Sequence, residues 1–243
     1  MNAIQDNKKL SNMLKQAAKH ISYYRPYLHV PFELWPVIDH TVLEDNADDF
    51  VSAKFKNVVE LCPEDLFGLC CRHGKLCYPK TEYVIEPAWA DESHKRFVPI
   101  VTTLNPKRYP HIRFRLKVLW RASETLCECQ DTHFVIDGVS GSTDEIIYVP
   151  HLFEKRSLPI FPDEMENLFE TFPEIQKYQI EQQTLNRWVI HCLTPDLKEL
   201  ESKLQDSLSH LLFSKQLQMP KVLFQSWDKA RRSAPGKVVK SFG

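Results

Sequence analysis

Glycine is scarce in this chain, with six residues among 243, whereas about 7% is usual in globular proteins. Loops that hold phosphate groups need closely spaced glycines, because only glycine lets the main chain approach a phosphate closely. Gly138 and Gly141 form the closest pair, and neither G-x-G-x-x-G nor G-x-x-x-x-G-K-[ST] occurs. The composition therefore argues against a self-contained P-loop or Rossmann nucleotide enzyme.

Long apolar runs and an excess of one charge are also lacking. No apolar stretch reaches the roughly 18 residues of a membrane helix, and MNAIQDNKKL lacks the apolar centre of a signal peptide. Thirty-one Lys and Arg balance 32 Asp and Glu, so the net charge is −1. This balance lacks the bulk positive charge typical of nucleic-acid proteins. We expect a cytoplasmic protein with no membrane span and no nucleic-acid partner.

Apolar periodicity predicts an α+β fold. We expect helices over residues 4–22, 163–172 and 195–213, with Pro26 ending the first and Asp163 capping the second. Residues 31–50 are predicted as an irregular connection with one short helix. Strands are expected over residues 82–86, 97–103, 112–120, 133–137, 145–149, 175–182, 185–193 and 220–226.

The segment IRFRLKVLW (112–120) has the clearest alternation. Its apolar side chains fall on one face of the expected strand, and Arg113, Arg115 and Lys117 fall on the other. This pattern is typical of a half-buried strand. The sequence pattern changes after Pro150, and it predicts a separate α+β domain of roughly the last hundred residues.

Several segments resemble one family when taken in order. PHIRFRLKVL (110–119) resembles the P-x-I-R-Y-R-L-x-D strand of the phenylacetate–coenzyme A ligase branch of the adenylate-forming enzymes. GSTDEIIYVP (141–150) resembles their hinge, G-R-x-D-D-I-I, and RRSAPGKVVK (231–240) is similar to their closing motif, P-R-T-x-x-G-K-x-x-R. SLPIFPDEMENLF (157–169) is similar to the start of the small mobile domain in capsule-cluster relatives, and YYRPYL (23–28) to the ligase N-terminus.

The resemblance implies a fold and a reaction. It implies an N-terminal helical segment (1–57), a strand-rich remnant of the large domain (58–143) and a small mobile α+β domain (144–243). The family reaction activates a carboxylic acid with ATP and Mg²⁺ to an acyl-adenylate, often followed by transfer to coenzyme A. A capsule-biosynthesis context is suggested by the same resemblance.

The sequence departs from the family pattern mainly at segments that would bind the nucleotide. No segment matches the loop S-G-T-[ST]-G-x-P-K that holds the ATP phosphates, so the chain resembles a shortened member. The Asp expected after RFRL is missing, since Lys117 and Val118 stand there. The hinge Arg is Ser142. We therefore expect impaired or absent activity in the isolated chain.

The resemblance implies roles for five residues. Lys237 is the implied catalytic lysine, which would stabilise charge between the carboxylate and the α-phosphate; the alternative is a solvated basic tail. Glu64 and Arg115 are implied to line the nucleotide pocket, or they are ordinary exposed charges. Asp144 and Glu145 are implied to form the hinge, or they form an ordinary turn that enters a strand.

Seven cysteines are present, and in a reducing compartment they are thiols or metal ligands rather than a disulfide framework. Cys71 and Cys77, together with Cys127 and Cys129, can close a tetrahedral structural zinc site from two loops. Related ligases carry C-x-x-G-x-L-H and C-P-C-G at these places. The alternative is a set of small buried thiols.

A second hypothesis is a non-catalytic module. Catalysis needs preorganised phosphate ligands, and this sequence contains no phosphate loop. The chain would then bind a protein partner that supplies the missing lobe.

Overall fold

The computed structural model describes residues 8–55, 66, 68–70, 75–105, 109–124, 133–228 and 238–240. The chain divides into two compact units, Met1–Val139 and Ser140–Gly243, here called unit 1 and unit 2. Helices and antiparallel strands make up unit 1, and unit 2 combines two α-helices with a mixed sheet. The α+β class expected from the sequence is therefore confirmed. No helix among the described residues is long and apolar enough to cross a membrane.

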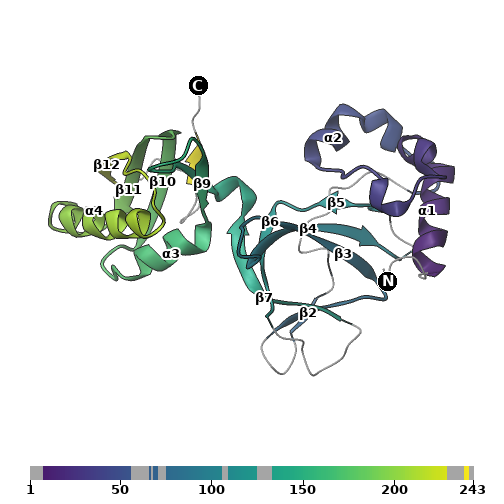
Figure 1. Cartoon of the computed structure of the whole chain (residues 1–243), viewed down its shortest axis with the longest axis horizontal. Helices are drawn as coiled ribbons and strands as arrows, with labels where there is room; N and C mark the ends of the chain where they lie inside the picture. Colours follow the sequence, from purple (N-terminus) through teal and green to yellow (C-terminus); the bar gives the residue numbers. More distant parts are fainter. Residues whose placement is uncertain are drawn as a thin grey trace. The chain divides into compact units, whose positions relative to one another are not determined.

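Short helices come first in unit 1 (Figure 1). The α-helix α1 ends at His20, and the 3-10 helix that follows contains Pro26. The expectation that Pro26 ends the first α-helix is therefore wrong, because Ile21 already adopts an extended conformation. The elements are α1 (Lys8–His20), η1 (Ser22–Tyr27), η2 (Phe32–Leu34), α2 (His40–Asp45) and η3 (Ala47–Phe50).

A seven-stranded sheet forms the rest of the described part of unit 1. Its order is β1-β2-β7-β6-β4-β3, and β5 pairs with β4. The last three residues of β7 cross into unit 2. The strands are β1 (Leu69–Cys70), β2 (Leu76–Pro79), β3 (Tyr83–Trp89), β4 (Arg96–Thr103), β5 (Phe114–Arg115), β6 (Val118–Ala122) and β7 (His133–Ser142).

The core of unit 1 joins the N-terminal helices to this sheet. Alternate residues of β4, such as Phe97 and Val101, pack with apolar side chains of α1 and of the segment around Trp35. Ile38 anchors that segment by main-chain bonds on both sides of β5: its N–H donates to Arg113 O at 2.9 Å, and its carbonyl accepts from Arg115 N at 2.7 Å. These bonds and contacts tie the described N-terminal residues, 8–55, to the sheet.

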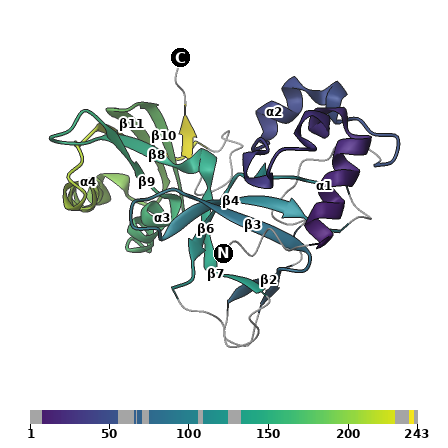
Figure 2. The same cartoon turned by 45° about the vertical axis from the view of Figure 1, so that its right-hand side comes forward.

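Unit 2 begins with a short 3-10 helix and a hairpin, and continues with two α-helices and a four-stranded sheet of order β12-β11-β10-β13. Figure 2 shows β13, in yellow, beside β10, with which it pairs in parallel. The elements are η5 (Thr143–Glu145), β8 (Ile147–Pro150), β9 (Ser157–Ile160), α3 (Pro162–Glu170), β10 (Lys177–Thr184), β11 (Arg187–Leu193), α4 (Leu197–Ser214), β12 (Lys221–Ser226) and β13 (Val238–Lys240).

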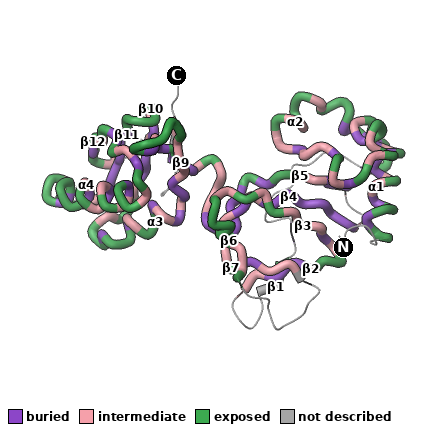
Figure 3. Tube along the Cα trace, viewed as in Figure 1, coloured by how far each residue is buried: buried purple, intermediate pink, exposed green. Residues whose placement is uncertain are grey.

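Helix α4 follows the predicted apolar spacing. Its buried residues recur at Leu200, Leu204, Leu208 and Leu212, and they pack with Trp188 and Ile190 of β11. Figure 3 shows the rest of α4 mostly exposed, as expected for a helix on one face of a sheet. Helix α4 is thus a core element of unit 2.

Helix α3 begins earlier than predicted. Its N-cap is Phe161 and not Asp163, because Pro162 takes the first helical position, where its fixed φ fits and no N–H is needed. The Glu164 carboxylate accepts a hydrogen bond from Phe161 N at 3.0 Å. Asp163 is therefore a residue of the first turn.

Candidate functional site

The segment 112–120 confirms the predicted alternation of burial but is not one strand. Its apolar residues are buried, whereas Arg115 and Lys117 are exposed. The chain forms β5 and β6 separately, and Arg113 has a positive φ of 50°. Arg113, which directly precedes β5, is therefore partly buried, unlike the exposed Arg115 and Lys117.

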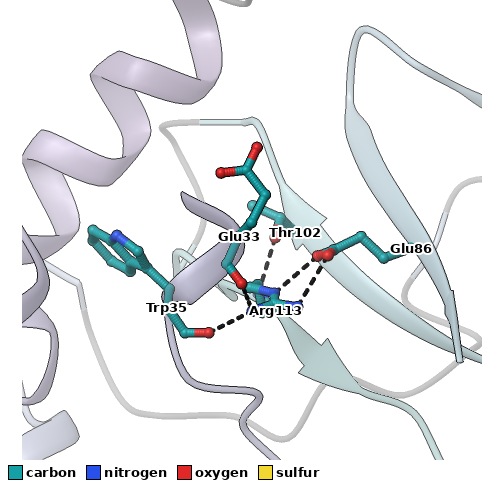
Figure 4. A network of polar contacts seen from close by, with 5 residues as sticks. All are labelled: Glu33, Trp35, Glu86, Thr102 and Arg113. Carbon is teal, nitrogen blue, oxygen red and sulfur yellow. Dashed lines mark hydrogen bonds and ion pairs between the residues drawn. The ribbon is translucent and has the colours of Figure 1, made fainter. Parts of the chain in front are cut away.

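Arg113 is the centre of a polar network that sequence reasoning missed (Figure 4). Its guanidinium forms two bonds of 3.1 Å to the Glu86 carboxylate. It also donates to the main-chain carbonyls of Glu33, at 2.7 Å, and Trp35. The Arg113 N–H donates to Thr102 Oγ1 at 2.9 Å. Arg113 therefore joins the N-terminal segment to β3 and β4, and it is a structural residue.

Arg115 is exposed on β5, opposite Ile100 of β4. Glu64, its expected partner at a nucleotide pocket, lies outside the described residues. Val118, at the position where the resemblance has the ribose-binding Asp, is only 7% exposed. A buried valine offers a ribose hydroxyl no hydrogen-bond acceptor, so this part of the family's nucleotide site is not rebuilt here.

The predicted hinge residues form a capped 3-10 turn. Ser142 Oγ accepts from Asp144 N at 3.3 Å, and the Glu145 carboxylate accepts from Ser142 N at 3.3 Å. This reciprocal pair is a capping box, which fixes the start of η5. The Glu145 side chain therefore caps η5, whereas Asp144 is exposed.

The strand β13 and the turn η5 meet in unit 2. Lys240 lies opposite Gln182 in the pairing of β13 with β10, and its Nζ is 5.7 Å from the ring centroid of Tyr148. Burial lowers the pKa of the Lys240 ammonium, and the negative charge of Asp144 opposes that shift. We define Lys240, Asp144 and Tyr148 as the η5–β13 corner. Lys237, the predicted catalytic lysine, lies outside the described residues and directly precedes β13.

The structure describes one of the four predicted zinc ligands, Cys77. Cys77 is buried on β2, and its thiol donates to the Lys75 carbonyl at 3.8 Å. Lys75 Nζ lies 2.6 Å from Ser123 Oγ, so the chain beside Cys77 contacts the chain that leads toward the C-x-C segment. Cys71, Cys127 and Cys129 lie outside the described residues. Within the described ranges, no group of three or more His, Cys, Asp or Glu side chains is placed to hold a metal ion.

Comparisons with known proteins give structural similarity alone. No family model and no curated protein matches the sequence. A 2-hydroxyisobutyryl-CoA ligase in its postadenylation state has a TM-score of 0.48 and 14% identity, over 68% of this chain and 37% of that one.

Two further similar structures are a fatty acyl-adenylate ligase from a study of the E. coli and L. pneumophila enzymes and an acyl acid amido synthetase, GH3.15. The first has a TM-score of 0.37 and 12% identity over 64% of this chain and 28% of its own. The second has a TM-score of 0.37 and 10% identity over 93% of this chain and 49% of its own. The chain thus spans between 28% and 49% of these proteins, which are adenylate-forming or acyl-acid ligases and synthetases.

Proposed function

We propose that this chain is a shortened adenylate-forming-ligase-type protein whose unit 2 takes part in acyl-adenylate formation, with weak activity in the isolated chain because the sequence contains no phosphate loop. The observation that supports it best is the order of the three motifs combined with the η5–β13 corner. The hinge-like segment begins at the boundary of the two units, and the strand that follows Lys237 lies against it.

The proposed reaction joins a carboxylic acid to ATP, with Mg²⁺ offsetting phosphate charge. The carboxylate oxygen attacks the α-phosphorus, the bond to the β-phosphate breaks, and the products are an acyl-adenylate and pyrophosphate. Lys237 would stabilise the charge that develops there, because an ammonium on a long side chain suits a transient phosphoryl charge. Transfer to coenzyme A would follow in the full family reaction.

ATP–pyrophosphate exchange with a panel of carboxylic acids tests the catalytic proposal. Exchange by the wild-type chain that is lost in Lys237→Ala supports it, and Lys221→Ala, an exposed lysine of β12, is the matched control. Exchange that persists in Lys237→Ala contradicts the role given to that lysine. Tight magnesium-dependent ATP binding by the isolated chain would contradict the idea that its site is incomplete.

A split enzyme or non-catalytic module is the second candidate. It is favoured by the absence of a phosphate loop from this sequence and by Val118 in place of the expected Asp. In this case the chain alone shows no exchange, and a protein that carries the phosphate loop restores it. A partner that binds without restoring exchange would indicate a purely structural module.

We also propose that a structural zinc ion joins Cys77 to Cys71, Cys127 and Cys129. The Lys75–Ser123 contact supports this, since both residues lie beside the segments that carry these cysteines. Metal analysis should find about one zinc per chain, and Cys77→Ser should lose it. Freshly purified protein with far less than one zinc per chain would contradict the proposal, and Cys192→Ser is the control.

A further inference from the structure

A pocket of about 220 Å³ lies in unit 1 between α1 and the segment 28–35. Leu10 and Leu14 of α1 form one wall, and Val30, Phe32 and Trp35 form much of the other. The Trp35 indole is fixed there, because its Nε1 donates to Val30 O at 3.1 Å. Apolar and aromatic side chains share the walls with the polar residues Ser11, Lys15 and Glu33, and every residue that lines the pocket belongs to unit 1.

One acid is among the residues that line the pocket. Glu33 lines the pocket, and its Oε1 is buried with no hydrogen-bond partner among the described residues. The main-chain carbonyl of Glu33 is held by Arg113 at 2.7 Å. Figure 4 shows the Glu33 carboxylate pointing away from that guanidinium, which is already paired with Glu86. Arg113 therefore fixes the position of Glu33 and leaves its carboxylate to another donor.

A buried carboxylate oxygen without a donor is costly, since desolvation of an ionised group is offset only by a paired charge or hydrogen bonds. Lys15 also lines the pocket but is exposed, and the described ion pairs include none between Lys15 and Glu33. The missing partner should therefore carry both a positive charge, for Glu33, and an apolar body, for the walls.

We propose that this pocket binds a small organic ammonium ion, with the ammonium on Glu33 and the hydrocarbon part against Leu10, Leu14 and Trp35. At the ~30 Å³ that a water molecule occupies in the liquid, the volume suits about seven non-hydrogen atoms. The ligand is thus smaller than a drug-sized molecule. This site is independent of the proposed adenylation function, because it uses none of the residues assigned to that function.

Cyclohexylammonium is a suitable probe, and cyclohexanol is its neutral counterpart of the same size. Titration of the full chain at neutral pH, followed by two-dimensional NMR, should shift the signals of Leu10, Leu14 and the Trp35 indole. Cyclohexanol should bind at least about tenfold more weakly, because it cannot form a charge-assisted hydrogen bond to Glu33. Equal binding of the two probes, or no binding of either, would overturn the proposal.

Three variants complete the experiment. Glu33→Gln keeps the size of the side chain and should weaken cyclohexylammonium about tenfold or more. Leu28→Trp keeps the Glu33 carboxylate and should abolish binding, because the larger side chain would fill the pocket. Leu28 lines the pocket and is 41% exposed, so the change can be made without disturbing the core. Asp45→Asn removes an exposed acid of α2 outside the pocket and should bind like wild type. Unchanged binding in both Glu33→Gln and Leu28→Trp would place the ligand elsewhere and overturn the proposal.

Discussion

At the scale of single residues, neighbouring basic side chains have different roles. Arg113 and Arg115 lie two positions apart, and the sequence pattern gives both the same solvent face. The structure separates them, because the positive φ of Arg113 turns its side chain to Glu86 and to main-chain carbonyls. The guanidinium of Arg113 is mostly buried, at 14% exposure, so its ion pair is well shielded from solvent.

We expect Arg113→Met to lower the free energy of unfolding by about 3 kcal/mol, because removing one partner leaves Glu86 and two carbonyls without a donor. Arg115→Met, two residues further along and exposed, should change it by less than about 0.5 kcal/mol. Urea denaturation followed by circular dichroism measures both. Equal effects of the two substitutions would show that the network contributes little.

Cys192 gives a prediction for alkaline pH. Burial raises the pKa of its thiol to about 12 from an ordinary value of 9.0. The unfolded chain loses this proton first, so the folded state is favoured below pH 9 and that contribution is lost between pH 9 and 12. Unfolding free energy should therefore fall more steeply over this range in wild type than in Cys192→Ala. Buried tyrosines such as Tyr178 contribute equally in the two proteins, so the difference between them reports on Cys192. Equal pH dependence of the unfolding free energy in wild type and Cys192→Ala would contradict the prediction.

At the scale of elements, the start of unit 2 depends on one glycine. Gly141 has a φ of +122°, and a Cβ there would lie 2.5 Å from Pro162 Cβ, at the first position of α3. The residue therefore brings the end of β7 close to α3, directly before η5.

Gly141→Ala should destabilise unit 2 by between about 1 and 3 kcal/mol, because alanine rarely adopts this φ and Pro162 has little freedom to move. Gly138→Ala is the matched control. Its Cβ would meet the end of the Arg121 side chain at 2.7 Å, which can swing away. Hydrogen exchange of α3 amides measures the effect, and similar exchange in the two variants would refute the special role of Gly141.

The η5–β13 corner predicts a coupling between two elements far apart in sequence. Asp144→Asn removes the charge that raises the pKa of Lys240, so burial should lower that pKa further than in wild type. NMR of the lysine side chains against pH measures the shift. Asp137→Asn, on β7 in unit 1, should leave Lys240 unchanged. An unaltered Lys240 titration in Asp144→Asn would show that the two side chains do not interact.

Local patterns predicted the longer helices and strands, but they missed the short strands β1, β2, β9 and β13 and the contacts between distant segments. The leucine spacing of α4 and the alternation at 112–120 follow from burial of one face, which a sequence displays directly. The break at Arg113 and the contact of Lys240 with η5 depend on chain segments that only the tertiary structure brings together. The N-cap of α3 was misplaced by two residues, because Pro162 fits the first helical position and the Glu164 carboxylate accepts a hydrogen bond from Phe161 N.

At the scale of the whole molecule, each unit has its own core. Residues from Leu10 to Ile136 form one core, and residues from Ile147 to Val238 form the other. The Arg113 network belongs to the first and Gly141 to the second.

We therefore expect two unfolding transitions in urea, one per core. Arg113→Met should shift the transition reported by amides of β4, and Gly141→Ala the transition reported by amides of β11. Hydrogen exchange at increasing urea separates the two sets of amides. A single transition that both variants shift equally would show that the cores unfold together.

The pairing of β13 with β10 has a consequence during protein synthesis. β10 leaves the ribosome early, but its outer edge stays open until β11, α4, β12 and finally residues 238–240 have been translated. The nascent sheet thus displays an unpaired strand edge while the residues between β10 and β13 are being translated. Slow translation of this region should raise the demand for chaperones, and a premature stop codon before residue 238 should give an aggregation-prone product.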